Sequence, residues 1–178
     1  MKKVLIISAS FRDRSNSDIL SDAFMNGAKA SGHSVEKISL KGKDIKFCTG
    51  CMECHHSDKC PLHDDSIEIV QKMREADVIV LATPIYFYEM CGQLKTLLDR
   101  THPLYGRDYN FRDVYILTSS AASGDSASAK AINGIKGWVD CFSNATLKGT
   151  LCASGMWNAG DIENHEYLEQ AYKLGQNV

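Results

Sequence analysis

Proline, long apolar runs and net charge are all scarce in this sequence. Only three of the 178 residues are prolines, and no proline-rich or serine-rich linker, repeat or low-complexity stretch divides the chain. A chain of this length without a linker is expected to build one core. We therefore predict one domain over residues 1–178.

The sequence also has no apolar run long enough to cross a membrane. The longest, residues 78–88, is interrupted by Thr83 and Pro84, whereas a membrane helix needs about 20 apolar residues. The apolar stretch at residues 4–7 is too short for a signal peptide and is typical of a buried strand. A net charge of −2 predicts no basic surface for nucleic acid or an anionic membrane. We expect a cytoplasmic protein that binds neither.

Cysteine, by contrast, is abundant and unevenly placed. The chain has seven cysteines, an odd number that argues against a disulfide framework. Cys48, Cys51, Cys54 and Cys60 lie in one loop, residues 48–60, with the spacing C-x2-C-x2-C-x5-C, and Pro61 follows. Such a group of thiols in a reducing compartment is typical of a metal or redox site. The other three cysteines are scattered and are expected to be small core residues.

The residues of the cysteine loop leave four interpretations open. Four thiolates can hold a 4Fe–4S cluster, and a bacterial ferredoxin run also ends in Cys-Pro. A zinc ion could take cysteines together with His55, His56 or His63. Two of the cysteines could form a reversible redox pair, or the loop could be reduced and hold no ligand.

Strand and helix patterns alternate along the rest of the chain. Ser17 or Asp18 is expected to cap the first helix, Gly32 to end it, and Asp64 or Asp65 to cap the next. Asp99 and Arg100 end a later helix and are expected to form an ion pair rather than act as catalysts. The strands are predicted at residues 4–8, 34–40, 78–82, 114–117 and 147–153, with helical patterns between them and a last helix at 163–174. This alternation predicts a parallel sheet with helices on both faces.

Ligands of such sheets bind beyond the carboxyl ends of the strands, which points to the loops at residues 8–17, 83–91 and 118–126. The first loop, SASFRDRSNS, offers hydroxyls, an amide and two guanidinium groups beside a helix N-terminus. These groups suit a phosphate, although a polar turn with a helix cap explains them as well. The loop contains neither G-x-G-x-x-G nor the triphosphate-binding P-loop motif.

The second loop follows the most apolar strand and places Tyr86, Phe87 and Tyr88 next to one another. Three adjacent aromatic residues cannot all point into the core, so they could flank a planar ring, cover the sheet edge or contact another subunit. The third loop, TSSAASGDSAS, is small and polar and could approach a ring closely.

These three loops resemble those of the NADPH-dependent FMN reductase branch of the flavodoxin-like superfamily, and especially its iron–sulfur flavoprotein members. The resemblance covers roughly residues 1–120 and is carried by SASFRDRSNS, CTGCMECHHSDKCPLHDD and ADVIVLATPIYFYEMCGQLKTLLDR. In the last segment Pro84, Tyr86, Gly92, Lys95, Asp99 and Arg100 fall where the family pattern has them. Phe11 stands where the family usually has proline, and Ser15 where it often has glycine.

The resemblance implies a flavodoxin-like three-layer sandwich, with five parallel strands in the order 2-1-3-4-5. It implies an FMN site in which the flavin, rather than any catalytic side chain, supplies the chemistry, and a 4Fe–4S cluster on the four loop cysteines. The implied FMN ligands are Ser8, Ser10, Arg12, Ser15, Asn16 and Ser17 around the phosphate, Thr83, Pro84, Ile85, Tyr86 and Phe87 along the ring and ribityl chain, and Ser119, Ser120 and Gly124 at the far edge of the ring.

The function implied is that of an FMN-dependent oxidoreductase. NAD(P)H, or a reduced ferredoxin, would pass electrons through FMN to a small acceptor such as a quinone, a flavin, or a nitro or azo compound. Two alternatives stay open: an iron–sulfur electron carrier with no small-molecule substrate, and a zinc- or redox-sensing flavodoxin-like module. A homodimer or higher homo-oligomer is expected from the family.

Overall fold

The computed structural model describes residues 1–178, apart from the side chain of Asp125. The strands are β1 (Lys3–Ser8), β2 (Ser34–Ser39), β3 (Val78–Tyr86), β4 (Glu89–Met90), β5 (Asp113–Ser119) and β6 (Thr146–Ala153). The helices are α1 (Asn16–Ala30), α2 (Cys54–Ser57), α3 (Ser66–Glu75), α4 (Gly92–Arg100), α5 (Ala129–Asp140) and α6 (Glu166–Gln176), with 3-10 turns η1 (His102–Leu104) and η2 (Asp125–Ser128).

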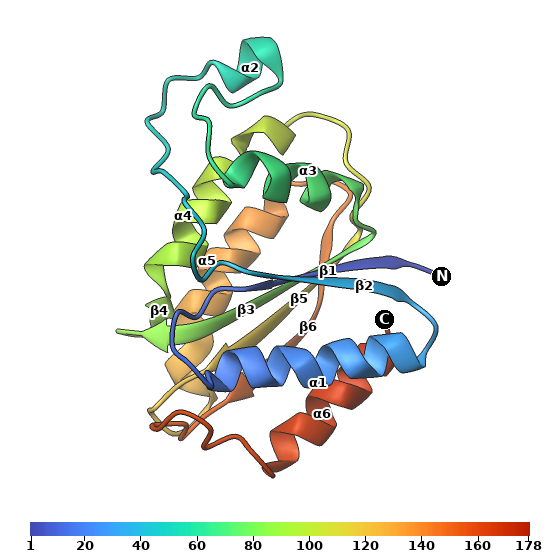
Figure 1. The fold of residues 1–178 in the computed structure, drawn as a ribbon, viewed down its shortest axis with the longest axis vertical. Helices are drawn as coiled ribbons and strands as arrows, with labels where there is room; N and C mark the ends of the chain where they lie inside the picture. The colour runs from blue at the N-terminus through green and yellow to red at the C-terminus, as the bar shows by residue number, and fades with distance from the viewer.

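The sheet has the strand order β2-β1-β3-β5-β6, and neighbouring strands in this series are parallel. Figure 1 shows α3, α4 and α5 on one face of the sheet and α1 and α6 on the other. The predicted three-layer sandwich and its strand order are therefore confirmed. A further strand, β4, is short and pairs antiparallel with the end of β3; it was not predicted from the sequence.

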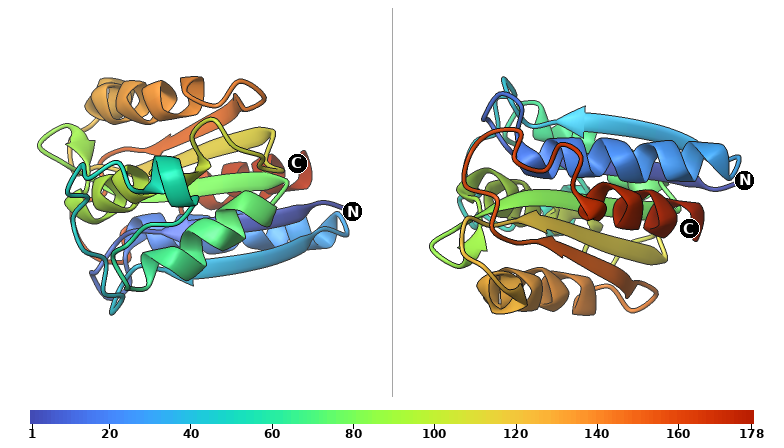
Figure 2. Two further views of the ribbon diagram at one scale, coloured as in Figure 1. Left: turned by 90° about the horizontal axis from the view of Figure 1, so that it is seen from above. Right: turned by 90° about the horizontal axis from the view of Figure 1, so that it is seen from below.

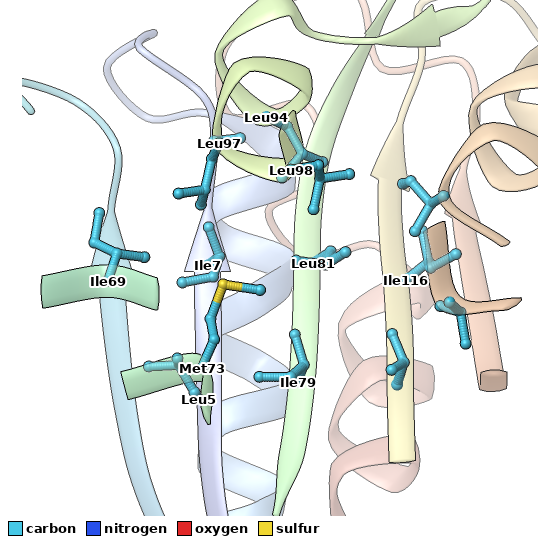
Figure 3. Close-up of a cluster of buried hydrophobic side chains, with 14 of the residues drawn as sticks. Leu5, Ile7, Ile69, Met73, Ile79, Leu81, Leu94, Leu97, Leu98 and Ile116 are labelled. Atoms are coloured by element: carbon cyan, nitrogen blue, oxygen red, sulfur yellow. The ribbon is translucent and has the colours of Figure 1, made fainter. Parts of the chain in front are cut away.

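The sheet is stabilised by hydrophobic side chains on both of its faces. Along β1, Ile7 belongs to the cluster beneath α3 and α4, and Ile6 to the cluster beneath α1 and α6; both side chains are fully buried. Figure 3 shows the first cluster, in which Met73 of α3 and Leu97 of α4 lie over Ile7 and Leu81. Burying a side chain of this size contributes roughly 1.5–3 kcal/mol. Central strands buried on both faces explain the continuous apolar run of β3.

Two helices begin at residues other than those predicted. The first helix starts at Asn16 because Ser15 has extended backbone angles, so Ser15 occupies the cap position expected of Ser17 or Asp18. The last helix starts at Glu166 rather than at 163, because Asn164 has a left-handed φ of 65° that cannot continue a right-handed helix. His165 caps this helix by accepting a hydrogen bond from the backbone N–H of Tyr167.

The cysteine loop extends from one end of the molecule. In Figure 1 the short helix α2 lies at the top, apart from the sheet. The carboxyl ends of the strands gather elsewhere, beside the start of α1 and the β3–β4 hairpin, and Figure 2 shows the same arrangement from above and below. Among the helices described, none combines the length and apolar character needed to cross a membrane.

Candidate functional site

A cavity of about 360 Å³ lies at the carboxyl ends of the strands. This volume falls within the range of small-molecule sites, about 300–1,000 Å³. Its lining comes from the loop before α1, the end of β3, the loop after β5 and a segment near the C-terminus: Ser10, Arg12, Ser15, Asn16, Pro84, Ile85, Tyr86, Ser119, Ala121, Met156 and Trp157. The three loops predicted from sequence therefore meet at one cavity, and a fourth segment joins them.

The end of this cavity that suits a phosphate is formed by the loop before α1. Ser10, Arg12, Ser15 and Asn16 line the cavity. No side chain accepts a cap hydrogen bond from the start of α1, so its first-turn N–H groups are available to an anion. Ser8 and Ser17 are fully buried and do not line the cavity: the Ser8 hydroxyl donates to Asp18 at 2.5 Å, and that of Ser17 lies 3.1 Å from Ser15 Oγ.

Three side chains of this loop attach it to residues 157–163. The Arg12 guanidinium donates to the carbonyl of Trp157 at 3.0 Å, and Arg14 pairs with Glu163 at 2.9 Å. Asn16 donates to the carbonyl of Asn158 at 2.8 Å and accepts from the N–H of Ile162 at 3.2 Å. The Asn16 amide therefore holds the fourth segment in place, rather than being free to bind a phosphate.

The opposite wall comes from the end of β3. Pro84, Ile85 and Tyr86 line the cavity, and the hairpin turns at Phe87 and Tyr88, which both have positive φ. Positive φ at two successive residues is the geometry of a tight β-hairpin turn. The turn points Phe87 away, and its side chain is 100% exposed. Thr83 is buried beneath the wall, where its hydroxyl accepts a hydrogen bond from the N–H of Cys91.

The loop after β5 supplies a smaller part of the lining. Ser119 faces the cavity, and Ala121, which was not among the predicted residues, lies beside it. Ser120 is buried and donates to the carbonyl of Ala122. Gly124, with φ 85°, does not line the cavity.

Met156 and Trp157 complete the cavity from a region where the sequence offered little signal. Trp157 is 73% exposed, although its backbone is held by Arg12. Neither residue was among those predicted to line the site. Both side chains offer apolar, polarizable contact to a planar ring.

A second cavity lies at the cysteine loop, and all four cysteines of the motif line it. The remaining lining includes Pro61, Leu62, Arg100 and His102. Positive φ values at Gly50 and Met52 turn the loop on both sides of Cys51. Burial raises the pKa of the Cys54 thiol, and the nearby thiols of Cys60, Cys48 and Cys51 raise it further. The fold thus gathers the four predicted metal ligands around one space.

His102, which is exposed, also reaches this loop. Its Nδ1 lies 2.9 Å from His55 Nε2 and 3.9 Å from Cys54 Sγ. These three ligand atoms lie within 4.8 Å of one another, close enough for a single ion. Among the described residues, neither His56 nor His63 joins such a group.

Arg100 and Asp64 form a buried ion pair at 2.5 Å beneath the cysteine loop. The expected pair between Asp99 and Arg100 is wrong, because the Asp99 carboxylate pairs with Lys95 one helical turn away. Burial raises the pKa of Asp64, but hydrogen bonds from Arg100, Ser66 and the N–H of Lys46 outweigh this effect and hold the pKa at about 2. Asp65 occupies the cap position of α3 without a side-chain cap hydrogen bond, and the Asp64 carboxylate accepts instead from the N–H of Ser66.

A sequence model of the NADPH-dependent FMN reductase family matches residues 2–158, which include every residue that lines the carboxyl-end cavity. The chain belongs to this family. It is 43% identical over 102 residues to an iron–sulfur flavoprotein of Methanocaldococcus jannaschii, a match that covers 57% of this chain and 53% of that protein. An iron–sulfur flavoprotein of Archaeoglobus fulgidus is 34% identical over 113 residues, which cover 64% of this chain and 51% of the relative. The chain therefore spans about half the length of these two relatives.

A solved structure confirms the fold over almost the whole chain. The NAD(P)H:quinone oxidoreductase from Methanothermobacter marburgensis superimposes with a TM-score of 0.77 at 21% identity, covering 99% of this chain and 95% of the other. The likeness includes the region after residue 120, where the sequence resemblance was weakest.

Proposed function

We propose that this protein is an FMN-dependent oxidoreductase that passes electrons from NAD(P)H, or from a reduced ferredoxin, to a small acceptor such as a quinone, a flavin, or a nitro or azo compound. The observation that carries the proposal is the cavity at the carboxyl ends of the strands. One end presents Arg12 and the free N–H groups of α1, and the other presents Ile85, Tyr86 and Trp157. A positively charged end and an apolar end match the phosphate and the ring of FMN, and family membership supports the same cofactor.

The residues of the cavity have separate tasks in this proposal. Arg12 and the α1 N-terminus hold the phosphate. Pro84 and Ile85 shape the wall beside the ring, while Trp157 limits access of water to it. When bound, FMN supplies the hydride and electron chemistry, and the protein supplies orientation and electrostatics. Ser8, Ser17, Thr83, Ser120 and Gly124 act from behind the lining, as supports of the loops that carry the ligands.

We further propose that Cys48, Cys51, Cys54 and Cys60 hold a 4Fe–4S cluster. Four thiols around one cavity are the donor set that such a cluster requires. Among the described residues, no three of these thiols lie within 4.8 Å of one another. This spread suits a cluster, which distributes its ligands over four irons, better than a single ion.

The position of the loop supports electron exchange between the two cofactors. The cysteine cavity is lined by Asp99 and Arg100 at the end of α4, whereas the β3–β4 hairpin beside the FMN cavity leads into Gly92 at its start. Eight residues of helix rise by about 12 Å. A hollow bordered by Phe11, Phe47 and Gln93 lies along α4 between the two sites.

Zinc is the second candidate for the loop, because Cys54, His55 and His102 are close enough to ligate one ion. This arrangement would favour a structural or sensing role for the loop.

Three exposed aromatic residues near the cavity support the predicted homodimer: Tyr86, Phe87 and Tyr88. The homodimer stays a prediction. The cytoplasmic location and the single domain also stay predictions.

The proposal is tested by an absorption spectrum of protein purified without oxygen, with iron, sulfide and zinc assayed on the same sample. We expect flavin bands and about four irons per chain. Two variants then distinguish the metals. Cys60→Ser should abolish iron binding, whereas His102→Ala should retain it, because only Cys60 belongs to the four-thiol set. If zinc is bound by Cys54, His55 and His102 instead, Cys60→Ser should retain the zinc and His102→Ala should lose it. Protein that binds no FMN would refute the central proposal.

A further inference from the structure

Arg100 is the largest fully buried side chain of the molecule, and it points toward the cysteine loop from the end of α4. Its guanidinium has four partners. One terminal nitrogen donates to the carbonyl of Lys46 at 2.8 Å and to the Asp64 carboxylate at 2.5 Å. The other donates to the sulfur of Cys60 and to the carbonyl of Leu62, each at 3.2 Å.

These partners lie on both limbs of the cysteine loop. Lys46 precedes Cys48 by two residues, and Cys60, Leu62 and Asp64 follow the turn of the loop. The N–H of Lys46 also donates to Asp64 at 2.9 Å, so the guanidinium and the carboxylate together close the base of the loop. One side chain of α4 therefore sets the distance between the two ends of the segment that carries all four cysteines.

An ion pair that served only stability would not need this geometry. Arginine and a carboxylate usually pair through two parallel hydrogen bonds, but here one nitrogen faces Asp64 and the other faces the Cys60 sulfur. Burying a charged pair has a large desolvation penalty and is weak evidence of a stabilising role. The Nε atom is also buried without a hydrogen-bond partner among the described residues. The arrangement thus directs a buried positive charge at one specific thiol.

We propose that Arg100 is a positioning residue for the iron–sulfur group, which holds the Cys60 sulfur and both ends of the cysteine loop in place and raises the reduction potential through its N–H to sulfur hydrogen bond. This inference rests on the proposed function, because it requires a cluster on the four cysteines. Reduction of a bound cluster, by dithionite in the experiment below, would add one electron without forming or breaking a bond. A hydrogen bond to a ligand sulfur favours the more negative, reduced state, so its loss shifts the potential to a more negative value.

The experiment compares Arg100→Lys and Arg100→Gln with Arg107→Gln. Arg107 is a matched control, since it donates to the carbonyl of His55 at 2.7 Å and pairs with Asp58 in the same loop. Neither of these contacts involves a cysteine sulfur. Each full-length protein is reconstituted anaerobically with ferrous iron and sulfide. The readouts are iron per chain, the rate of iron release to a chelator, and the midpoint of a dithionite titration followed by electron paramagnetic resonance.

We expect Arg100→Gln to release iron at least tenfold faster than the wild type and to titrate at a more negative potential. Arg100→Lys keeps the charge but loses the planar fork, so it should fall between the two. Arg107→Gln should stay within twofold of the wild type. Bound FMN and far-ultraviolet circular dichroism report whether each variant is folded.

Removing Arg100 alone leaves the buried Asp64 carboxylate without its partner and could prevent folding. The double variant Arg100→Gln with Asp64→Asn removes both charges and addresses this problem. If a folded double variant or Arg100→Lys releases iron and titrates like the wild type, the inference is overturned. Equal effects of the Arg107 and Arg100 substitutions would also overturn it, because they would reflect general loosening of the loop. Wild-type protein that binds FMN but no iron would overturn both this inference and the proposed cluster.

Discussion

Arg12 and Arg14 are two residues apart in the sequence, yet only Arg12 lines the carboxyl-end cavity. Arg14 turns outward with a φ of 49° and pairs with Glu163 on the surface. From the sequence, both guanidinium groups were expected in a phosphate-binding loop, and the family resemblance implied Arg12 alone as an FMN ligand. At this scale, the backbone angles of the loop decide which charge faces the ligand.

This difference between the two arginines predicts their effects on FMN binding. Arg12→Ala should weaken binding about 10- to 100-fold, because a hydrogen bond to a charged group contributes roughly 1.5–3 kcal/mol. Arg14→Ala should change it less than threefold, since an exposed ion pair contributes little. Quenching of flavin fluorescence on titration into apoprotein measures both. Equal losses in the two variants would place the phosphate elsewhere on the loop.

Helices α1 and α6 are the closest packed elements outside the sheet, and two glycines allow their approach. A Cβ atom at Gly27 of α1 would lie 2.0 Å from the carbonyl oxygen of Tyr172, and one at Gly175 of α6 would lie 2.1 Å from that of Phe24. Both neighbours are backbone atoms, which cannot rotate away. The contact also supports the site, because the segment that carries Trp157 leads into α6.

We expect Gly27→Ala to lower the free energy of unfolding by about 2 kcal/mol or more, since the added methyl forces the two backbones apart. Gly137→Ala in α5 is the matched control, because nothing lies within 4 Å of the added Cβ. In that variant alanine should leave the free energy unchanged or raise it by up to about 1 kcal/mol. Urea denaturation of both variants measures the difference. Similar values for the two would contradict the packing argument.

The cysteine loop, which carries the proposed metal site, lies apart from the sheet and from both hydrophobic clusters. None of the four loop cysteines belongs to either hydrophobic cluster of the described residues, and the loop extends away from the sheet in Figure 1. The FMN cavity instead lies directly on the strand ends. The two sites are therefore expected to respond differently to chemical removal of their cofactors.

We predict that anaerobic removal of iron with a chelator leaves FMN bound and lowers the thermal unfolding midpoint by only a few degrees. The cores that hold the FMN loops do not include the cysteine loop, so about 1 kcal/mol or less is expected to be lost, which corresponds to roughly 2–4 °C for a chain of this size. Differential scanning calorimetry and the flavin spectrum measure this outcome. Release of FMN together with iron would show that the two sites depend on one another.

Whereas the strand order came from the family resemblance, the alternation of strands and helices in the sequence predicted the fold class, because apolar periodicity is a local property. The same holds for the three ligand loops, which must meet where parallel strands end, and for the spacing of the four cysteines. The family resemblance supplied FMN as the expected cofactor. The match of residues 2–158 to the family model then confirmed the family.

Tertiary structure alone decided which residues of these loops face a ligand. Met156 and Trp157 follow Ala121 by 35 and 36 residues, and His102 follows Cys60 by 42, so no local pattern places them at their cavities. The pairing of Arg100 with Asp64 and Cys60 instead of Asp99 depends on how α4 packs against the cysteine loop. Such contacts join segments distant in the chain, and they exist only once the packing of the helices on the sheet has fixed the positions of those segments.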